Sequence, residues 1–314
     1  MAVAFVFPGQ GSQAVGMGKT LAEAFAPARA VFEEVDAALG ERLSAIMWNG
    51  PAETLTLTEN AQPALMAVSL AALRTLEAEA GVELARDAAF VAGHSLGEYS
   101  ALAAARSLSA ADAARLLRIR GRAMQKAVPV GAGAMAALIG VEIDKARTIA
   151  AEAAAAGICE VANDNGGGQV VLSGEKAAVE RAVEIAKTHG VKRAMLLPVS
   201  APFHCRMMQP AAEAMSEALS KVSVGAPAVP VVANVLAAPI TDPAGIVASL
   251  VRQVTGLVRW RESVEFMVKD GVTTFYEVGA GKVLAGLIKR VAEAASASSI
   301  GTPDDIARFK AARV

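Results

Sequence analysis

The sequence predicts an α/β protein, in which a large domain built on a parallel sheet carries a smaller inserted βαββαβ unit. Two observations lead to this prediction. Towards both ends of the chain, short apolar runs that stop at glycine or proline alternate with longer helical patterns, as in parallel strands buried under helices. In the middle, the patterns follow the order of a ferredoxin-like unit. The expected boundaries are residues 1–128 and 200–314 for the large domain and 129–199 for the small one.

The first elements of the large domain are two short buried strands. Val3–Phe7 ends at Pro8-Gly9, and Ala89–Ala92 ends at Gly93, as strands that enter loops do. Helical patterns stand between and after these strands, at residues 20–39, 62–80 and 97–105. We therefore expect the strands to run parallel, with helices on both faces of the sheet.

The insert begins after Pro129, where Gly131 and Gly133 break the helical pattern. Strands are expected at residues 135–141, 159–162, 169–172 and 193–199, and helices at 144–156 and 176–187. The polar, glycine-rich stretch Asn163–Gly168 predicts a hairpin loop between the second and third strands. About seventy residues are enough for a self-contained unit of this kind.

After the insert, the patterns of the large domain resume. Strands and helices are expected at residues 231–234, 246–255, 274–278 and 283–294. Thr302-Pro-Asp-Asp305 combines an N-cap residue, a proline and first-turn acids, so it predicts a final helix over residues 303–312. The uncharged stretch 222–240 is interrupted by three prolines, and we interpret it as a loop with a short buried strand rather than a membrane span.

The composition excludes several classes of function. Lys and Arg total 30 against 31 Asp and Glu, so no global charge attracts nucleic acid or an anionic membrane. Two cysteines and three histidines, in no metal-ligand spacing, predict neither a disulfide framework nor a metal site. The N-terminus lacks the basic segment and the long apolar run of a signal peptide. We expect a cytoplasmic protein with no metal, no nucleic-acid partner and no membrane partner.

Gly93-His-Ser-Leu-Gly97 fits the nucleophile-elbow pattern G-x-S-x-G, and it lies between a predicted strand and a predicted helix. The turn is so sharp that side chains at either glycine would clash, and it holds the serine in a strained conformation. The free N–H of Leu96, at the start of the helix, favours an oxyanion. The pattern predicts Ser95 as a nucleophile; the alternative is a chance match in a glycine-rich chain.

His204 is the candidate base. His94 adjoins Ser95, so its side chain should point away from the serine, and His189 lies at a polar helix end where a surface position explains it. Cys205 is interpreted as a small core residue. Hydrolases of this type place an acid between serine and histidine in the sequence. No strand-end acid stands out there, so a backbone or amide carbonyl is expected to orient the imidazole.

Arg120 is the candidate substrate-binding residue. The helix expected over residues 110–125 carries one apolar face, which comprises Leu116, Leu117, Arg120 and Met124. Three further arginines fall on the opposite face and are expected to be solvated: Arg115, Arg118 and Arg122. A buried arginine is uncommon unless it is paired. Arg120 is therefore either part of a structural ion pair or a bidentate clamp for a substrate carboxylate.

Six motifs occur in a fixed order along nearly the whole chain, from about residue 3 to about residue 308. They are Phe7-Pro-Gly-Gln-Gly-Ser-Gln13, Gly93-His-Ser-Leu-Gly-Glu98, Arg120-Gly121, Val161-Ala-Asn163 with Gln169-Val-Val171, Ala201-Pro-Phe-His204, and Glu277-Val-Gly-Ala-Gly-Lys282. Together they resemble the malonyl-CoA:acyl-carrier-protein transacylases of fatty-acid synthesis and the related acyltransferase domains of polyketide synthases.

The resemblance implies an α/β-hydrolase-like large domain and a ferredoxin-like small one. It also implies that Ser95 takes malonyl from malonyl-CoA and passes it to the phosphopantetheine thiol of acyl carrier protein, with no cofactor. We expect a monomer, because such an enzyme must present one open cleft to a partner protein.

Roles for several residues follow from the same resemblance. His204 is implied as base and acid, and Arg120 as the malonate clamp. Gln10 is implied to supply a second oxyanion N–H beside that of Leu96. The main-chain carbonyl of Gln253 is implied to hold the imidazole.

Three residues are candidates for lining the substrate: Met124, Asn163 and Phe203. In polyketide relatives, phenylalanine before the histidine accompanies malonyl and serine accompanies methylmalonyl. Phe203 either crowds an α-methyl group in this way or only packs under the small domain. Asn163 and Asn165 either reach the site or only form a polar hairpin.

Three functions remain open. The first is malonyl transfer, to a fatty-acid carrier or, as a trans-acting polyketide-type enzyme, to a polyketide carrier. The second is a serine esterase or thioesterase, which the buried Arg120 and the absent triad acid disfavour. The third is a non-catalytic module that binds carrier protein, which intact Ser95, His204 and Arg120 disfavour.

Overall fold

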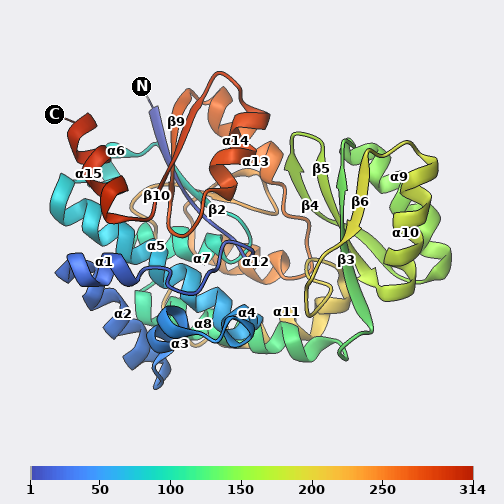
Figure 1. The fold of residues 1–314 in the computed structure, drawn as a ribbon, viewed down its shortest axis with the longest axis horizontal. Helices are drawn as coiled ribbons and strands as arrows, with labels where there is room; N and C mark the ends of the chain where they lie inside the picture. The colour runs from blue at the N-terminus through green and yellow to red at the C-terminus, as the bar shows by residue number, and fades with distance from the viewer. Residues whose placement is uncertain (1, 314) are drawn as a thin grey trace.

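The computed structural model describes residues 2–313 and contains a parallel-rich sheet and a separate antiparallel sheet (Figure 1). The first sheet has the strand order β10-β9-β1-β2-β7-β8, and its pairs are parallel except for β7 with β8. Its strands are β1 (Ala2–Phe7), β2 (Phe90–Gly93), β7 (Val231–Ala233), β8 (Ala238–Ile240), β9 (Val272–Val278) and β10 (Ser296–Ile300). The predicted α/β class with a mainly parallel sheet is confirmed.

Helices cover both faces of this sheet, and β1 shows why. Its side chains alternate, so that Phe5 and Phe7 enter one hydrophobic cluster while Ala4 and Val6 enter another. The first cluster is built largely by α1 (Lys19–Ala24), α2 (Ala26–Leu39), α3 (Leu43–Asn49), α5 (Thr58–Ala80), α7 (Gly97–Ala104), α8 (Ala110–Ala127), α11 (Gln209–Leu219), α12 (Pro243–Gln253) and α15 (Pro303–Ala312). The second is built by α13 (Trp260–Lys269) and α14 (Val283–Val291). Two short helices, α4 (Ala52–Thr56) and α6 (Leu84–Asp87), complete this part.

The antiparallel sheet follows the predicted βαββαβ order and lies to the right in Figure 1. Its strands are β3 (Gly133–Ile139), β4 (Cys159–Gly166), β5 (Gln169–Glu175) and β6 (Arg193–Leu196), arranged in the order β4-β5-β3-β6. Helices α9 (Ile143–Ala153) and α10 (Lys176–Thr188) cover one face and share a hydrophobic cluster with it. A 3₁₀ turn, Ala154–Ala156, follows α9.

Three expected elements differ from the structure. β4 continues through Asn163–Asn165 to Gly166, so the predicted hairpin loop shrinks to the left-handed Gly167 and Gly168. The expected helix over residues 20–39 is two helices, because Pro27 has no N–H with which to continue α1. The last strand of the insert ends at Leu196. The final helix has the predicted bounds and carries a complete capping box.

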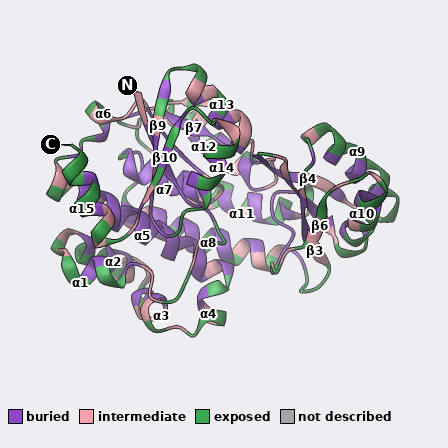
Figure 2. Ribbon diagram, turned by 45° about the horizontal axis from the view of Figure 1, so that its top comes forward, coloured by how far each residue is buried: buried purple, intermediate pink, exposed green. Residues whose placement is uncertain are grey.

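Two buried contacts hold helices of the larger part in place. Figure 2 shows α5 and α8 largely buried in the middle of the molecule, where they cross closely. Gly121 permits this crossing, since a Cβ there would overlap the backbone of Glu59. At the end of β9, the Glu277 carboxylate accepts N–H bonds from Leu284 (3.0 Å) and Ala285 (2.8 Å) and caps α14, which gives that motif a structural role. Within residues 2–313, no helix is both long and apolar enough to cross a membrane.

Candidate active site

Ser95 stands on the sharp turn between β2 and α7, with φ = 53°. This left-handed conformation is strained for a residue with a side chain. A Cβ at Gly93 would overlap the Gly97 carbonyl, and a Cβ at Gly97 would overlap the Phe7 carbonyl of β1. The predicted elbow geometry, with both glycines required and the serine strained, is confirmed.

The imidazole of His204 faces the serine. Its Nδ1–H donates to the main-chain carbonyl of Gln253 at 3.0 Å, which leaves Nε2 to accept from the Ser95 hydroxyl at 2.7 Å. No Asp or Glu of residues 2–313 lies within 4.0 Å of this ring. The His204 pKa is lowered to about 3, mainly by burial and next by the positive charge of Arg120. The ring is therefore neutral near pH 7 and able to accept a proton.

Arg120 is 1% exposed and is held by neutral groups. Its Nη1 donates to Gln62 Oε1 at 2.7 Å, and its Nη2 donates to Gln253 Oε1 at 2.9 Å and to Ser95 Oγ at 3.1 Å. Its Nε is buried and has no partner among the described residues. No carboxylate in that part of the chain lies within 4.0 Å of the guanidinium, so the ion-pair alternative for Arg120 is not what the structure contains.

One expectation about the same helix is wrong. Arg118 is buried rather than solvated, because α8 packs against α2 and α5 as well as against α11. Its guanidinium donates to Asn60 and to Glu41. Arg115 and Arg122 are exposed, as expected. The Arg118 ion pair compensates for its burial and leaves Arg120 as the cation that faces the serine.

The two residues expected to bind an oxyanion belong to the serine turn itself and to the loop after the neighbouring strand β1. Leu96 is the N-cap of α7, and Gln10 lies in the loop after β1, where its Oε1 accepts from Thr58 Oγ1 at 2.8 Å. Neither backbone N–H has an acceptor within residues 2–313. The Ser95 N–H, in contrast, donates to Asn234 Oδ1 at 2.7 Å. Gln10 and Leu96 thus have the unpaired donors that an oxyanion site needs.

The three substrate-lining candidates lie in different surroundings. Met124 is buried on α8, and its Sδ accepts from Gln62 Nε2 at 3.7 Å. Phe203 is buried in the large hydrophobic cluster next to His204. Asn163 is buried in β4 and forms an isolated parallel bridge with Val258. Packing therefore accounts for Phe203 and backbone pairing for Asn163, and a contact of either with substrate stays a prediction.

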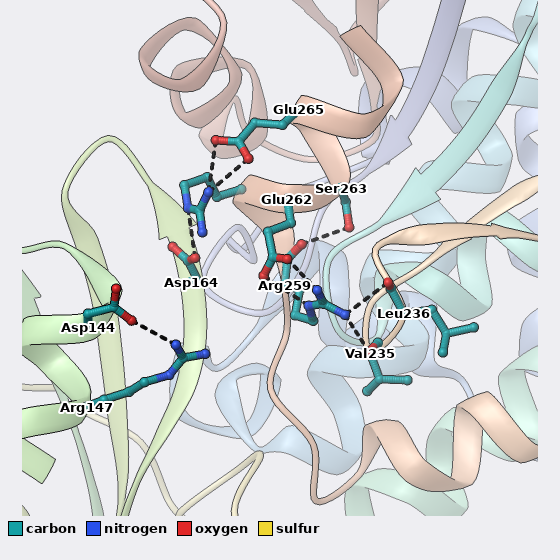
Figure 3. Close-up of polar contacts among 10 residues, drawn as sticks. Asp144, Arg147, Asp164, Val235, Leu236, Arg259, Glu262, Ser263 and Glu265 are labelled. Atoms are coloured by element: carbon teal, nitrogen blue, oxygen red, sulfur yellow. Dashed lines mark hydrogen bonds and ion pairs between the residues drawn. The ribbon is translucent and has the colours of Figure 1, made fainter. Parts of the chain in front are cut away.

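The strand segment Asn163–Asn165 joins the antiparallel sheet to the rest of the molecule. The Asp164 N–H donates to the Val258 carbonyl at 2.9 Å. Its carboxylate, seen in Figure 3, accepts from Arg261 Nε, also at 2.9 Å. Asn165 Oδ1 accepts from His94 Nε2 at 2.9 Å. Asn163 and Asn165 therefore lie in a buried strand of the β4–β5 hairpin, where they join it to the rest of the molecule, rather than in its loop.

The other histidines and both cysteines lie outside the serine–histidine pair. The His94 side chain is directed to Asn165 and to the Trp260 ring, 5.8 Å between centroids. His189 pairs with Glu152 at 3.1 Å. Cys159 and Cys205 are buried free thiols, and the prediction that Cys205 is a core residue is confirmed. Residues 2–313 contain no group of three or more His, Cys, Asp or Glu that could hold a metal ion.

Sequence reasoning missed the polar side chains that support the site. Gln62 lies on the buried face of α5, Asn234 follows β7, and Glu98 lies in the first turn of α7. Asn234 also donates through Nδ2 to the Gly93 carbonyl at 2.7 Å, so it spans the elbow. The available signal was a polar residue in or beside an apolar run, but that signal does not identify a partner.

Comparisons with known proteins give matches over nearly the whole chain. Residues 4–308 match the family model described as the acyl transferase domain. The chain is 46% identical over 304 residues to the malonyl CoA-acyl carrier protein transacylase of Escherichia coli K12, and the match covers 97% of each chain. The acyl-carrier-protein S-malonyltransferase of Bartonella henselae is 57% identical, with full coverage of both chains and a TM-score of 0.97. A malonyl-transacylase solved with its type II PKS acyl-carrier protein is 41% identical, with 99% and 100% coverage and a TM-score of 0.95.

Proposed function

The chain belongs to the acyl transferase family, and we propose that it transfers the malonyl group of malonyl-CoA to the phosphopantetheine thiol of an acyl carrier protein. The observation that carries the proposal is Arg120. A buried guanidinium held only by neutral partners, next to the nucleophile, suits an acyl group that ends in a carboxylate. The relatives named for malonyl transfer support the same substrate.

The first half-reaction acylates the serine. His204 Nε2 takes the proton of the Ser95 hydroxyl while Oγ attacks the thioester carbonyl. The N–H groups of Gln10 and Leu96 bind the oxyanion, and Arg120 binds the free carboxylate. When the tetrahedral intermediate collapses, the C–S bond breaks and the proton on His204 passes to the sulfur of coenzyme A. Malonyl-Ser95 and free coenzyme A result.

The second half-reaction runs the same steps in reverse with a different thiol. His204 takes the proton of the phosphopantetheine thiol as its sulfur attacks the ester carbonyl. The C–O bond to Ser95 breaks, the serine oxygen takes back the proton, and malonyl leaves as a thioester on the carrier. The overall scheme is ping-pong.

The group that orients His204 affects whether the acyl group is passed to a thiol or hydrolysed. A carbonyl of Gln253 orients His204, where a hydrolase has a carboxylate that stabilises the imidazolium. A thiol needs less help than water to lose its proton, since thiol pKa values lie near 8.5. An imidazole without a carboxylate partner is a weaker base than the histidine of a hydrolase, so it activates thiols more readily than water. This argues against the esterase and thioesterase alternative.

The two sheets support a division of the chain into two domains. The elbow at the end of a central parallel strand supports an α/β-hydrolase-like large domain over residues 1–128 and 200–314. The βαββαβ order with strand order β4-β5-β3-β6 supports a ferredoxin-like small domain over residues 129–199.

A cavity of ≈ 360 Å³ beside Gln10 and Pro198–Ser200, where the chain returns from the insert, suits the approach of a thioester arm.

A fatty-acid carrier is the first expectation for the partner, because curated relatives are malonyl CoA-acyl carrier protein transacylases. The neighbour solved with a type II PKS carrier keeps a polyketide carrier as the second candidate. Comparing kcat/KM for carriers of the two kinds decides between them.

The experiment that tests the function is mass spectrometry of the protein mixed with malonyl-CoA. One malonyl group should appear on Ser95, and Ser95→Ala should remove it without loss of fold, because the hydroxyl contributes little to packing. Holo carrier protein should then discharge the adduct, whereas apo carrier, which lacks the thiol, should not. Rapid hydrolysis of the adduct, no adduct, or a label on Cys205 would each contradict the proposal.

A further inference from the structure

Glu98 is a buried acid that the reaction as written does not use. It lies in the first turn of α7, three residues after Ser95, and is 2% exposed. No Lys, Arg or His of residues 2–313 forms an ion pair with it within 4.0 Å. A carboxylate in such a place needs hydrogen-bond donors to compensate for its burial. The donors it has show what it holds in place.

Both donors belong to segments that build the site. One carboxylate oxygen, Oε2, accepts from the Asn234 N–H at 3.0 Å and from Gln253 Nε2 at 2.8 Å. Asn234 in turn holds the elbow through the Gly93 carbonyl and the Ser95 N–H. Glu98 therefore ties the end of β7 and the end of α12 to the helix that carries the nucleophile.

The contact with Gln253 decides which way that amide faces. Its Nε2 donates to Glu98 and to the Ser95 carbonyl (3.0 Å), so its Oε1 faces Arg120 and accepts from Nη2 at 2.9 Å. A rotated amide would place its oxygen against two acceptors and its nitrogen against a cation. Of the two acceptors, the Glu98 carboxylate forms the stronger, charge-assisted bond when it is ionised.

From this arrangement we propose that Glu98 is a positioning residue for malonyl transfer, which acts by fixing the Gln253 side chain that holds Arg120 in place for the substrate carboxylate. The inference rests on the proposed function. It assigns Gln253 two separate tasks: its main-chain carbonyl orients His204, and its side chain, oriented by Glu98, positions Arg120.

The arrangement also keeps Arg120 available to substrate. A directly paired Glu98 would compete with malonate for the guanidinium, whereas one placed beyond an amide steadies the arginine without occupying it. Burial raises the pKa of Glu98 to about 7, while Asn234, Gln253 and Arg120 act in the opposite direction. Oε2 can accept both hydrogen bonds in either protonation state, because a proton can reside on Oε1.

The test compares single-turnover acylation of Ser95 by malonyl-CoA and by acetyl-CoA, which has no carboxylate for Arg120 to bind. Glu98→Ala should lower the malonyl-to-acetyl rate ratio about ten-fold. Glu98→Asp, which keeps the charge but falls short of Gln253, should lower it in the same direction. Glu98→Gln should keep the ratio close to the wild-type value, since one amide oxygen can accept both hydrogen bonds. Ser100→Ala, another buried polar residue of α7, is the matched control and should leave the ratio unchanged.

A double-mutant cycle tests the route through Gln253. Gln253→Ala should lower the ratio by itself, and adding Glu98→Ala should then change it little, because the contact is already gone. Equal losses with both substrates, or no rescue by Glu98→Gln, would overturn the inference. Additive losses in the double variant would also overturn it. If wild-type protein takes no malonyl group, the proposed function fails instead, so the two failures are distinguishable.

Discussion

Replacing Arg120 tests the basis of malonyl selectivity most directly. Malonyl-CoA and acetyl-CoA differ at the reacting end by one carboxylate, and that charge is costly in a buried site unless it is paired. Truncating one side of a desolvated charge pair costs about 2–5 kcal/mol. Arg120→Ala should therefore slow malonyl transfer by about 30-fold to 5,000-fold.

Acetyl transfer should respond differently. Acetyl has no carboxylate to lose, and Arg120 is held only by neutral acceptors in the free enzyme, so its removal leaves no buried charge without a partner. The malonyl-to-acetyl ratio should therefore shrink or invert while the serine stays reactive.

The assay is single-turnover acylation of Ser95 with each thioester, followed by intact-protein mass spectrometry. Arg120→Met preserves most of the buried volume and should give the same change in ratio, which separates charge from cavity. Arg122→Ala, exposed on the same helix, is the control and should leave both rates unchanged. If both rates fall together in the Arg120 variants, the arginine has a structural role and the reasoning for malonyl is refuted.

Two further predictions concern His204. Because a carbonyl orients it, no single Asp→Asn or Glu→Gln change should reproduce the roughly 10⁴-fold loss in kcat that follows removal of a triad aspartate; one folded variant with such a loss would identify a different third member. Its folded-state pKa of about 3 lies below the ordinary 6.5, so its contribution to stability is present above about pH 6.5 and is lost as pH falls towards 3. Denaturant titrations should show a shallower loss of unfolding free energy over that window in His204→Gln than in wild type, and parallel curves would contradict the burial argument.

Most of the fold was predictable because its signals are local. A strand that stops at glycine, a helix with a capping box and the βαββαβ order each depend on neighbouring residues. The misplaced elements had weaker local signals. The segment Asn163–Asn165 is polar and precedes three glycines, yet it forms strand, because pairing with Val258 and contacts with Arg261 and His94 outweigh its turn propensity.

The features of the candidate site differ in the same way, because some have local sequence signals and others depend on distant elements. Local pattern alone predicts the elbow at Ser95 and the apolar helix face that carries Arg120, since both follow from spacing within one turn or one helix. Spacing could not predict that Arg118 is buried on the other face, because α2 and α5 cover it only after the chain has folded. Nor could it predict that Arg120 meets Gln62 and Gln253, which lie 58 and 133 positions away. Local sequence specifies which backbone shapes are possible, but which buried charge meets which amide depends on how distant elements pack, and that was decided by the tertiary structure.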